Sequence, residues 1–435
     1  MPATAKSQTP LRLGIAGLGT VGIGVVKIVA QHADMIAARA GRPVVITAVS
    51  ARDRTKNRDA DLSGFAWEAD PVALAQRDDV DVFIEVMGGH EGPARAATEA
   101  AIAAGKDVVT ANKALLAHHG QALALAAEAK GLALRFEAAV AGGIPVIKVL
   151  TEGLAGNAMR RVMGVMNGTC NYILTRMESA GLPYDQVFEE ARQLGYLEAD
   201  PNLDVGGIDA GHKLSLLAAI AFGTQVSFDA VELEGIGSVS IDDIRLAADM
   251  GYKIKLLGVA QMTGRGLEQR MTPCLVPADS PLGQLQGGTN MVVLEGDSVG
   301  QIVLRGPGAG MGPTASAVMG DVIDLARGLR IPAFGRPAAG LAVPVAAATT
   351  APAPYYLRMT LLDKPGALAK IATCLGDSGI SIDRMHQYGH AGASEAPVLI
   401  VTHKATRDDI NHATGRFAAT GVMVGAPVAI RIEEV

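Results

Sequence analysis

The sequence predicts an α/β protein with a doubly wound parallel sheet, followed by an α+β domain and a small C-terminal β-α-β module. The first indication is a short buried strand that leads directly into a glycine-rich turn and an apolar helix. The second is the alternation of apolar strands with alanine-rich helical stretches in the N-terminal third of the chain. The third is the length of 435 residues, which exceeds one hydrophobic core of about 150 residues.

The N-terminal sheet begins with the strand Leu11-Arg12-Leu13-Gly14-Ile15-Ala16, which is followed by Gly17-Leu18-Gly19-Thr20-Val21-Gly22. Further strands are predicted over 44–49, 82–86, 107–110 and 132–136, with helices over 93–104 and 113–129. Strands joined by helices pair in parallel, and such sheets bind ligands beyond the carboxyl ends of their strands. We therefore expect a Rossmann-type domain over residues 11–144, preceded by a disordered tail over residues 1–10.

The middle of the chain, residues 145–305, mixes helices and strands. Helices are predicted over 187–194 and 208–222, and strands around 231–239, 253–262 and 291–304. The glycine-rich run Gly306-Pro307-Gly308-Ala309-Gly310-Met311-Gly312-Pro313 then opens a helix near Thr314. We expect residues 306–332 to return to the first domain and pack on it.

The C-terminal module over residues 355–435 follows a linker over residues 333–354, which is rich in proline and alanine. Strands are predicted over 355–361, 380–385 and 397–402, and a helix over 367–375, after the turn Asp363-Lys364-Pro365-Gly366. About 80 residues suffice for a small independent sandwich.

Composition excludes several classes of protein. The 44 acidic and 38 basic residues give a net charge of -6 and are mixed along the chain, so no basic stripe marks a nucleic-acid surface. Cys170, Cys274 and Cys374 lack the spacing of a zinc site or a disulfide framework, which fits the reducing cytoplasm. The polar N-terminus and the lack of an apolar run of roughly 18 residues argue against a signal peptide and a membrane protein.

The glycine turn carries the first chemical signal. Gly17, Gly19 and Gly22 permit a tight bend and let backbone amides approach a pyrophosphate, while Thr20 and Val21 open the helix that packs on the strand. The same spacing also occurs in plain packing turns. Its place after the first buried strand, within a series of βα units, favours dinucleotide binding by these residues.

The end of the second strand, Val49-Ser50-Ala51-Arg52-Asp53-Arg54, bears on which dinucleotide is bound. An acidic residue at this point binds the ribose hydroxyls of NAD and repels a 2′-phosphate. Small residues followed by Arg52 and Arg54 suit a 2′-phosphate, although Asp53 lies between them. The sequence favours NADP over NAD, with Arg52 as the expected contact.

Two lysines are candidates for acid–base chemistry. Lys113 comes shortly after Thr110, which ends the fourth strand, and lies in the first turn of the next helix. The helix macrodipole disfavours a cation at this place, so its presence favours a functional role. The alternative is a side chain that faces solvent. Asp209 and Lys213 form an i,i+4 pair that leads into the apolar run Leu214–Phe222. A surface salt bridge would have polar neighbours, so the apolar run favours a lysine that acts as proton donor at the edge of a buried region.

Histidines and a cysteine are rival candidates. His118, His119 and His212 lie beside helical segments without a metal-ligand spacing, and we expect surface or packing roles for them. Cys170, within Asn167-Gly168-Thr169-Cys170-Asn171-Tyr172, would be the nucleophile of an acylating aldehyde dehydrogenase, but no partner base is evident.

Four motifs, GLGTVGIG, ANKALLA, MNGTCNYIL and GYLEADPNLDVGGIDAGHK, occur in the order seen in homoserine dehydrogenases. The chain resembles this family over essentially its whole length, and the last motif is the most specific. The resemblance implies interconversion of L-homoserine and L-aspartate 4-semialdehyde with NAD(P), in the biosynthesis of threonine, methionine and isoleucine. Leu197 departs from the alanine of many relatives, which puts only local packing in doubt.

The resemblance also assigns roles to residues. Lys213 would protonate the carbonyl oxygen during hydride transfer, with Lys113 assisting near the nicotinamide and Asp209 orienting Lys213. Glu198 would hold the substrate ammonium, and Asp204 and Asp209 would orient the substrate. The further contacts expected are Gly195 and Tyr196 for the substrate, and Gly88, Thr110, Lys113 and Gly308 for the cofactor.

A structural monovalent cation, Na⁺, is a further implication of the resemblance. Its ligands would be largely backbone oxygens, and they map to Glu137, Val140, Gly142 and Ile144.

The C-terminal segment YYLRMTLLDKPGALAKIATCLGDSGISIDRMHQ resembles an ACT domain, a ferredoxin-like fold whose DxPG turn binds small amino acids. The resemblance implies allosteric regulation, with threonine as the expected effector near Asp363 and Gly366, and a homodimer or homotetramer. A dimerisation module that binds no ligand is the alternative for this segment. For the whole chain, the alternatives are an acylating semialdehyde dehydrogenase and a non-catalytic amino-acid sensor.

Overall fold

The computed structural model describes residues 9–198, 200–389 and 393–434, so all but the last two residues of the predicted disordered tail lie outside the described residues. The chain divides into two compact units. The first comprises Met1–Gly168, Asp209–Val231 and Thr289–Pro344, and the second Thr169–Ile208, Glu232–Gly288 and Val345–Val435.

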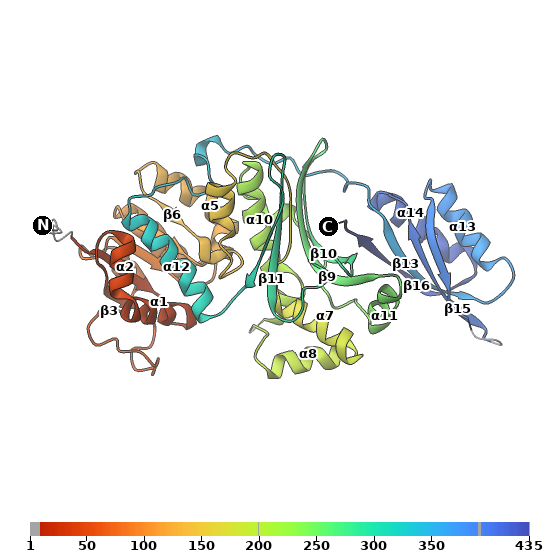
Figure 1. The fold of residues 1–435 in the computed structure, drawn as a ribbon, viewed down its shortest axis with the longest axis horizontal. Coiled ribbons are helices and arrows are strands. Elements are labelled where there is room, and N and C mark those ends of the chain that lie inside the picture. The colour runs from red at the N-terminus through yellow and green to blue at the C-terminus, as the bar shows by residue number, and fades with distance from the viewer. Residues whose placement is uncertain (1–8, 199, 390–392, 435) are drawn as a thin grey trace, which may run out of the picture. The chain divides into compact units, whose positions relative to one another are not determined.

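A parallel six-stranded sheet forms the core of the first unit (Figure 1). Its strands are β1 (Leu11–Ala16), β2 (Val44–Ser50), β3 (Ala66–Glu68), β4 (Val82–Glu85), β5 (Asp107–Thr110) and β6 (Leu134–Arg135). The order β3-β2-β1-β4-β5-β6 has its switch point between β1 and β4, where doubly wound sheets bind ligands. The predicted Rossmann-type sheet is confirmed, except that the short strand β3 was not predicted.

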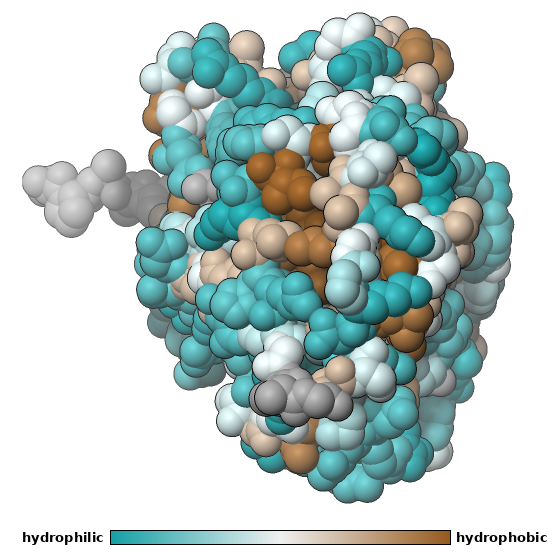
Figure 2. Space-filling model, turned by 90° about the vertical axis from the view of Figure 1, so that its right-hand side faces the viewer, coloured by the Kyte–Doolittle hydropathy of each residue, from teal (hydrophilic) through white to brown (hydrophobic). Residues whose placement is uncertain are grey.

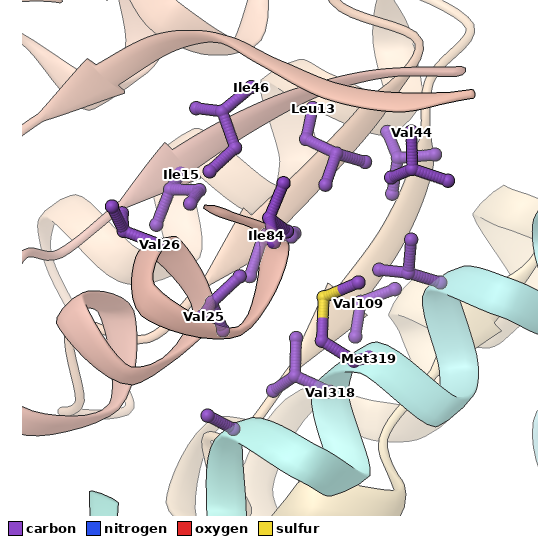
Figure 3. Close-up of a cluster of buried hydrophobic side chains, with 14 of the residues drawn as sticks. Leu13, Ile15, Val25, Val26, Val44, Ile46, Ile84, Val109, Val318 and Met319 are labelled. Carbon is purple, nitrogen blue, oxygen red and sulfur yellow. The ribbon is translucent and has the colours of Figure 1, made fainter. Parts of the chain in front are cut away.

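Helices cover this sheet, and one of them comes from late in the chain. They are α1 (Thr20–Gln31), α2 (Ala33–Ala40), α3 (Pro71–Ala75), α4 (Pro93–Ala103), α5 (Lys113–Glu128) and α12 (Met311–Ala326). Figure 3 shows Val318 and Met319 of α12 in the same apolar cluster as Ile15, Val25 and Ile84. The segment that follows the glycine-rich run therefore packs on the N-terminal sheet.

The contact between α1 and α12 is close. A Cβ on Gly24 of α1 would lie 2.8 Å from the Cβ of Ala315 and 2.8 Å from the carbonyl oxygen of Met311. Only a residue without a side chain fits at this crossing.

The remaining elements of the first unit include a second, antiparallel group of strands. They are β7 (Met159–Val165), β11 (Thr289–Gly296) and β12 (Gly300–Pro307), in the order β12-β11-β7. The helices are η1 (Glu137–Ala139), α6 (Val146–Lys148), η2 (Val149–Gly153), α10 (Ile208–Phe222), η3 (Phe228–Ala230) and η4 (Ala338–Gly340). The single strand predicted around 291–304 is wrong: β11 and β12 form a hairpin that turns between Gly296 and Gly300, where Gly300 has a φ of 72°.

The second unit is built on a sheet in the order β9-β10-β16-β13-β15-β14, with β8 beside β10. Its strands are β8 (Glu232–Leu233), β9 (Tyr252–Thr263), β10 (Gly266–Pro277), β13 (Tyr355–Leu362), β14 (Ile382–Gln387), β15 (Glu395–Thr402) and β16 (Met423–Ile432). Its helices are α7 (Gly168–Ala180), α8 (Tyr184–Gln193), α9 (Pro201–Val205), α11 (Ile241–Asp249), α13 (Ala367–Asp377), α14 (Arg407–Phe417) and η5 (Ala418–Thr420).

The second unit contains an apolar core and a buried group of ion pairs. Helices α13 and α14 pack on the C-terminal strands around a core that includes Leu357, Ile371 and Phe417. Glu433, which follows β16, forms an ion pair with β10. The buried guanidinium of Arg270 contacts both Glu268 and Glu433.

The surface of the protein includes an apolar region. Figure 2 shows the face at the right of Figure 1, where apolar residues gather near the centre and hydrophilic residues surround them. Within the described residues no single helix has the length and apolar composition of a membrane span. Only α1 and α2 taken together reach that length and composition, and the chain bends by 86° between them.

Candidate active site

A cleft of about 750 Å³ opens at the carboxyl ends of β1, β2 and β4 in the first unit. Its lining includes Gly17, Gly19, Arg52 and Gly88 of the predicted cofactor residues. Gly17 has a φ of 104°, and a Cβ there would lie 2.6 Å from the carbonyl oxygen of Val86. A side chain would collide with the backbone that follows β4, so only glycine lets these two segments lie so close together at the edge of the cleft.

The N-terminus of α1 borders the same cleft. Gly22 packs on Gly17, since a Cβ on Gly22 would lie 1.9 Å from the Gly17 carbonyl oxygen. The helix opens at Thr20 and Val21, and its N-cap, Gly19, provides no side-chain hydrogen bond. The first amides of α1 are thus not capped by a side chain, which is the arrangement that binds anions at helix N-termini.

In the loop after β2, the carboxylate of Asp53 is hydrogen-bonded to other residues of the same loop. The Asp53 carboxylate accepts hydrogen bonds from the Thr55 hydroxyl at 2.7 Å and from the backbone N–H groups of Thr55 and Lys56 at 2.8 and 3.2 Å. The bonds from Thr55 lower the pKa of Asp53. Arg52 and Asp53 both line the cleft, and the Asp53 carboxylate also serves as the acceptor of this turn.

Arg58 holds this loop against the glycine turn. Its Nε donates to the carbonyl oxygen of Leu18 at 3.2 Å, and its Nη2 donates to that of Asp53 at 2.5 Å. The guanidinium also lies 5.6 Å from the ring centroid of Trp67, above which Arg54 lies at 5.8 Å. Hydrogen bonds and a cation–π contact therefore fix the shape of the loop.

Glu85, at the end of β4, is a buried carboxylate that the sequence did not single out. Its Oε1 accepts from the backbone N–H groups of Met87 at 2.7 Å and Gly88 at 3.2 Å, and its Oε2 accepts from the Thr110 hydroxyl at 2.6 Å. Burial raises the pKa of Glu85 in spite of these bonds. Glu85 thereby connects Gly88 and Thr110, two of the predicted cofactor residues.

The three predicted catalytic residues come together around one carboxylate. The Nζ of Lys213 lies 2.6 Å from Asp209 Oδ2, and the Nζ of Lys113 lies 2.9 Å from Asp209 Oδ1. Lys213 and Asp209 share one face of α10, while Lys113 is the first residue of α5. The solvent-facing alternative for Lys113 is therefore wrong.

A segment after β7 adds a second fixed partner for the lysine. The Nζ of Lys213 donates to the carbonyl oxygen of Met166 at 2.9 Å, and the Nδ2 of Asn167 donates to Asp209 Oδ2 at 3.4 Å. An ammonium group has three N–H donors, of which Asp209 and Met166 take two. Among the described residues, the third N–H of Lys213 has no hydrogen-bond partner.

The charges around Asp209 are unequal. Burial favours the neutral acid, but the charges of Lys213 and Lys113 and their hydrogen bonds hold the pKa of Asp209 well below its usual range. Two ammonium groups beside one carboxylate leave a net positive charge. Such a charge stabilises an oxyanion that develops during a reaction.

Histidine rings pack near this group in the first unit. The ring centroid of His212 lies 5.6 Å from that of His118 and 4.2 Å from that of Phe228, and His90 stacks on His118 at 4.4 Å. Burial lowers the pKa of His212 to about 4, so its ring is neutral near neutral pH. These are packing contacts, whereas His119 contacts a carboxylate at the surface.

The predicted substrate residues other than Asp209 lie in the second unit. Asp204 on α9 is buried, and its Oδ2 accepts the backbone N–H of Glu198, whose side chain is exposed. Gly195 has a φ of 74°, and the half-exposed ring of Tyr196 stacks on Tyr172 with centroids 4.6 Å apart. These contacts organise the loop that precedes α9.

Cys170 has the environment of a structural thiol. Its side chain is fully buried, and the Sγ donates to the carbonyl oxygen of Asp204 at 3.3 Å. Cys170, Cys274 and Cys374 form no disulfide. A buried thiol in this setting is not an activated nucleophile.

The turn predicted to hold a cation has an unusual backbone. Ala141 and Gly142 both have positive φ values, 57° and 52°, between the buried residues Val140 and Ile144. The Glu137 carboxylate accepts from two backbone N–H groups of the following helix, so a cation here would be held by carbonyl oxygens. Within the described residues no group of three or more His, Cys, Asp or Glu side chains could hold a metal.

The DxPG turn lies between β13 and α13. Gly366 precedes the first residue of α13 with a φ of 80°, and the backbone N–H of Asp363 donates to Ser394 at 2.9 Å.

Three family models match the chain: homoserine dehydrogenase over residues 145–323, homoserine dehydrogenase NAD binding domain over 17–137, and ACT domain over 355–420. A homoserine dehydrogenase of Neisseria gonorrhoeae is 41% identical over 431 residues, which are 98% of this chain and 99% of that protein. The chain belongs to the homoserine dehydrogenase family.

Solved structures agree. A homoserine dehydrogenase from Thiobacillus denitrificans has a TM-score of 0.92 at 39% identity and covers 98% of this chain, which covers 99% of it. A hyperthermophilic archaeal homoserine dehydrogenase in complex with NADPH has a TM-score of 0.62 at 26% identity over 73% of this chain and 97% of its own. This homoserine dehydrogenase is an NAD(P)-dependent oxidoreductase with a C-terminal ACT domain, and nothing supports an acylating enzyme or a non-catalytic sensor.

Proposed function

We propose that Lys213 is the proton donor of this homoserine dehydrogenase when L-aspartate 4-semialdehyde is reduced to L-homoserine. The observation that carries the proposal is the group formed by Lys213, Asp209 and Lys113, in which one buried carboxylate orients two ammonium groups. The reduced nicotinamide, when bound, supplies the hydride. Lys213 stabilises the developing alkoxide and transfers a proton from Nζ to it, and Lys113 adds positive charge.

A Lys213→Met variant tests this role. Loss of the donor should lower kcat for NADPH oxidation with aspartate semialdehyde by about 10³-fold, within the range of general acid catalysis. Lys130→Met, at an exposed position of the first unit, is the matched control and should keep wild-type turnover. Wild-type turnover in Lys213→Met would overturn the assignment.

The same proposal includes a preference for NADP over NAD, with Arg52 as the contact of the 2′-phosphate. It is supported by the engagement of Asp53 within its own loop, by the position of Arg52 at the cleft, and by the archaeal relative seen with NADPH. Gly17, Gly19, Thr20, Val21 and Gly22 hold the pyrophosphate in this proposal, and Gly88, Thr110, Lys113 and Gly308 are further cofactor contacts.

Replacing Arg52 should separate the two cofactors. Arg52→Met removes the guanidinium that pairs with the phosphate, so kcat/KM for NADPH should fall about 10- to 100-fold while that for NADH changes little. Arg39→Met is the control, because this arginine is exposed on α2 and does not line the cleft. An equal loss with both cofactors would contradict the role of Arg52.

On the substrate side, we propose that Glu198 binds the substrate ammonium, that Asp204 orients the substrate, and that Gly195 and Tyr196 complete the site. The hydrogen bond from Glu198 to Asp204 supports a common role for these two residues.

The remaining proposals concern regulation and assembly. Threonine would bind near Asp363 and Gly366, and Na⁺ would bind the carbonyl oxygens of the turn that contains Glu137, Val140, Gly142 and Ile144. The apolar patch in Figure 2 supports a homodimer or homotetramer, because patches of this kind are typical of subunit contacts. The three free cysteines support a cytoplasmic location. In this proposal the enzyme acts in the biosynthesis of threonine, methionine and isoleucine.

The domain limits are also kept as proposals: 11–144, 145–305, 306–332, 333–354 and 355–435. The packing of α12 on α1 supports the return segment.

A further inference from the structure

Asn290 on β11 shares a hydrogen-bond acceptor with the proposed proton donor. Its Nδ2 donates to the carbonyl oxygen of Met166 at 3.1 Å, and the same oxygen accepts from Lys213 Nζ at 2.9 Å. The side chain is 1% exposed, so this bond lies in the interior of the first unit. Asn290 and Lys213 are therefore linked through the carbonyl group of Met166.

The other end of the amide is unsatisfied. Among the described residues no donor reaches the buried Oδ1 of Asn290. An unpaired buried acceptor costs free energy, and an apolar side chain of the same shape would avoid that cost. Turning the amide over would place Oδ1 against the Met166 carbonyl oxygen, so the observed orientation is the one that serves Met166.

The glycine-rich turn holds the amide in place. A Cβ on Gly308 would lie 2.0 Å from the Nδ2 of Asn290, so the backbone of this turn packs directly on the amide. On its other side, the carbonyl oxygen of Gly308 would lie 2.4 Å from a Cβ on Gly142. The turn at Gly308 is thus held between Asn290 and Gly142, and its backbone leaves the Asn290 side chain little room to rotate.

We propose that Asn290 is a positioning residue for proton transfer: it fixes the Met166 carbonyl group, and this group fixes the ammonium of Lys213. With Asp209 and Met166 both held, the third N–H of Lys213 points in one direction. The inference rests on the proposed role of Lys213.

Asn290→Leu tests the inference, because leucine keeps the branched shape and removes the donor. We expect kcat to fall about 10- to 100-fold, the cost of a misplaced catalytic group, while KM for NADPH and for aspartate semialdehyde stays within about twofold. The melting temperature should stay the same or rise, since the unpaired Oδ1 is gone. The ratio of kcat in H₂O to kcat in D₂O should increase, because proton transfer becomes slower.

Two variants complete the experiment. Asn290→Ala removes the same donor without the bulk of leucine beside Gly308, so its kcat should fall by the same factor even if leucine is strained. Asn171→Leu is the matched control, a buried asparagine of the second unit whose Oδ1 accepts from Lys255 and whose Nδ2 donates to Gly287. It should lower the melting temperature and leave kcat and its isotope effect unchanged.

The outcomes are separable. Wild-type kcat in both Asn290 variants overturns the inference, and so does a loss of kcat that is accompanied by a lower melting temperature and an unchanged isotope effect. If Lys213→Met is inactive and Asn290→Leu is fully active, only the role of Asn290 fails. If Lys213→Met keeps its turnover, the proposed function fails as well.

Discussion

Glu137 is a carboxylic acid that the fold keeps partly protonated near neutral pH. Burial, together with the neighbouring Asp321, raises the pKa of Glu137 to about 7, and the opposing backbone hydrogen bonds and Lys148 do not compensate. Its carboxylate accepts from the backbone N–H groups at the start of α6, so the acid links the turn over 137–144 to the next helix.

The sign of the resulting pH dependence is fixed. The pKa in the folded state, about 7, lies above the ordinary 4.5, so between these values the folded protein keeps a proton that the unfolded chain releases. This residue therefore favours folding less as pH rises from 5 to 8. Glu137→Gln does not titrate, so the melting temperature of the variant minus that of the wild type should increase from pH 5 to pH 8. An equal difference at both values would show that Glu137 is ionised in the folded protein.

Sequence reasoning reached some site residues and not others for a physical reason. The i,i+4 spacing of Asp209 and Lys213 was sufficient, because a helix brings such residues together locally. Lys113 joins them only through the tertiary structure. Glu85 and Asn290 gave no signal, since each adjoins an apolar strand segment, and their bonds to the Thr110 hydroxyl and the Met166 carbonyl oxygen form only in the folded chain.

At the scale of elements, the position of α12 depends on a glycine in α1. The contact at Gly24 leaves no space for a methyl group against the Met311 carbonyl oxygen and Ala315. On the exposed face of α14, by contrast, nothing lies within 4 Å of a Cβ on Gly415.

The two glycines should respond oppositely to the same substitution. Gly415→Ala should stabilise the protein by up to about 1 kcal/mol, through helix propensity alone. Gly24→Ala should destabilise it by about 1–3 kcal/mol, because overpacking outweighs the same gain. Denaturant unfolding of both variants measures the difference, and stabilisation by Gly24→Ala would show that α12 is not packed closely on α1.

Strand β10 is an element that the hydrophobic pattern of the sequence did not predict. Residues 266–277 were not predicted as a strand, because Glu268 and Arg270 interrupt the apolar pattern with charges that read as exposed. Both are buried in the structure and compensate one another, together with Glu433 from the end of the chain. The N-terminal sheet was predictable because most of its strands are largely apolar and helices connect them.

At the scale of the whole molecule, the division into two units with separate cores predicts that a change in one unit affects that unit first. The second unit offers a sharp case. Arg270 is almost completely buried, and Glu433 supplies one of its two carboxylate partners.

Glu433→Gln should destabilise the second unit by about 3 kcal/mol, because it leaves a buried guanidinium with only one carboxylate. Glu434→Gln is the control, since Glu434 is exposed and its pair with Lys404 lies at the surface. Calorimetry should show a lower transition for one unit only. A change of similar size in both variants would contradict the role of the buried network.

The contact of Arg58 and Arg54 with Trp67 has a practical consequence, because Trp67 is the only tryptophan in the sequence. Its indole lies against the loop that borders the cofactor cleft, so the tryptophan fluorescence of the protein has a single source, which lies in the first unit. Emission at tryptophan wavelengths should report nucleotide binding through energy transfer to a reduced nicotinamide. It should also follow the unfolding of the first unit independently of the ACT domain, without any label.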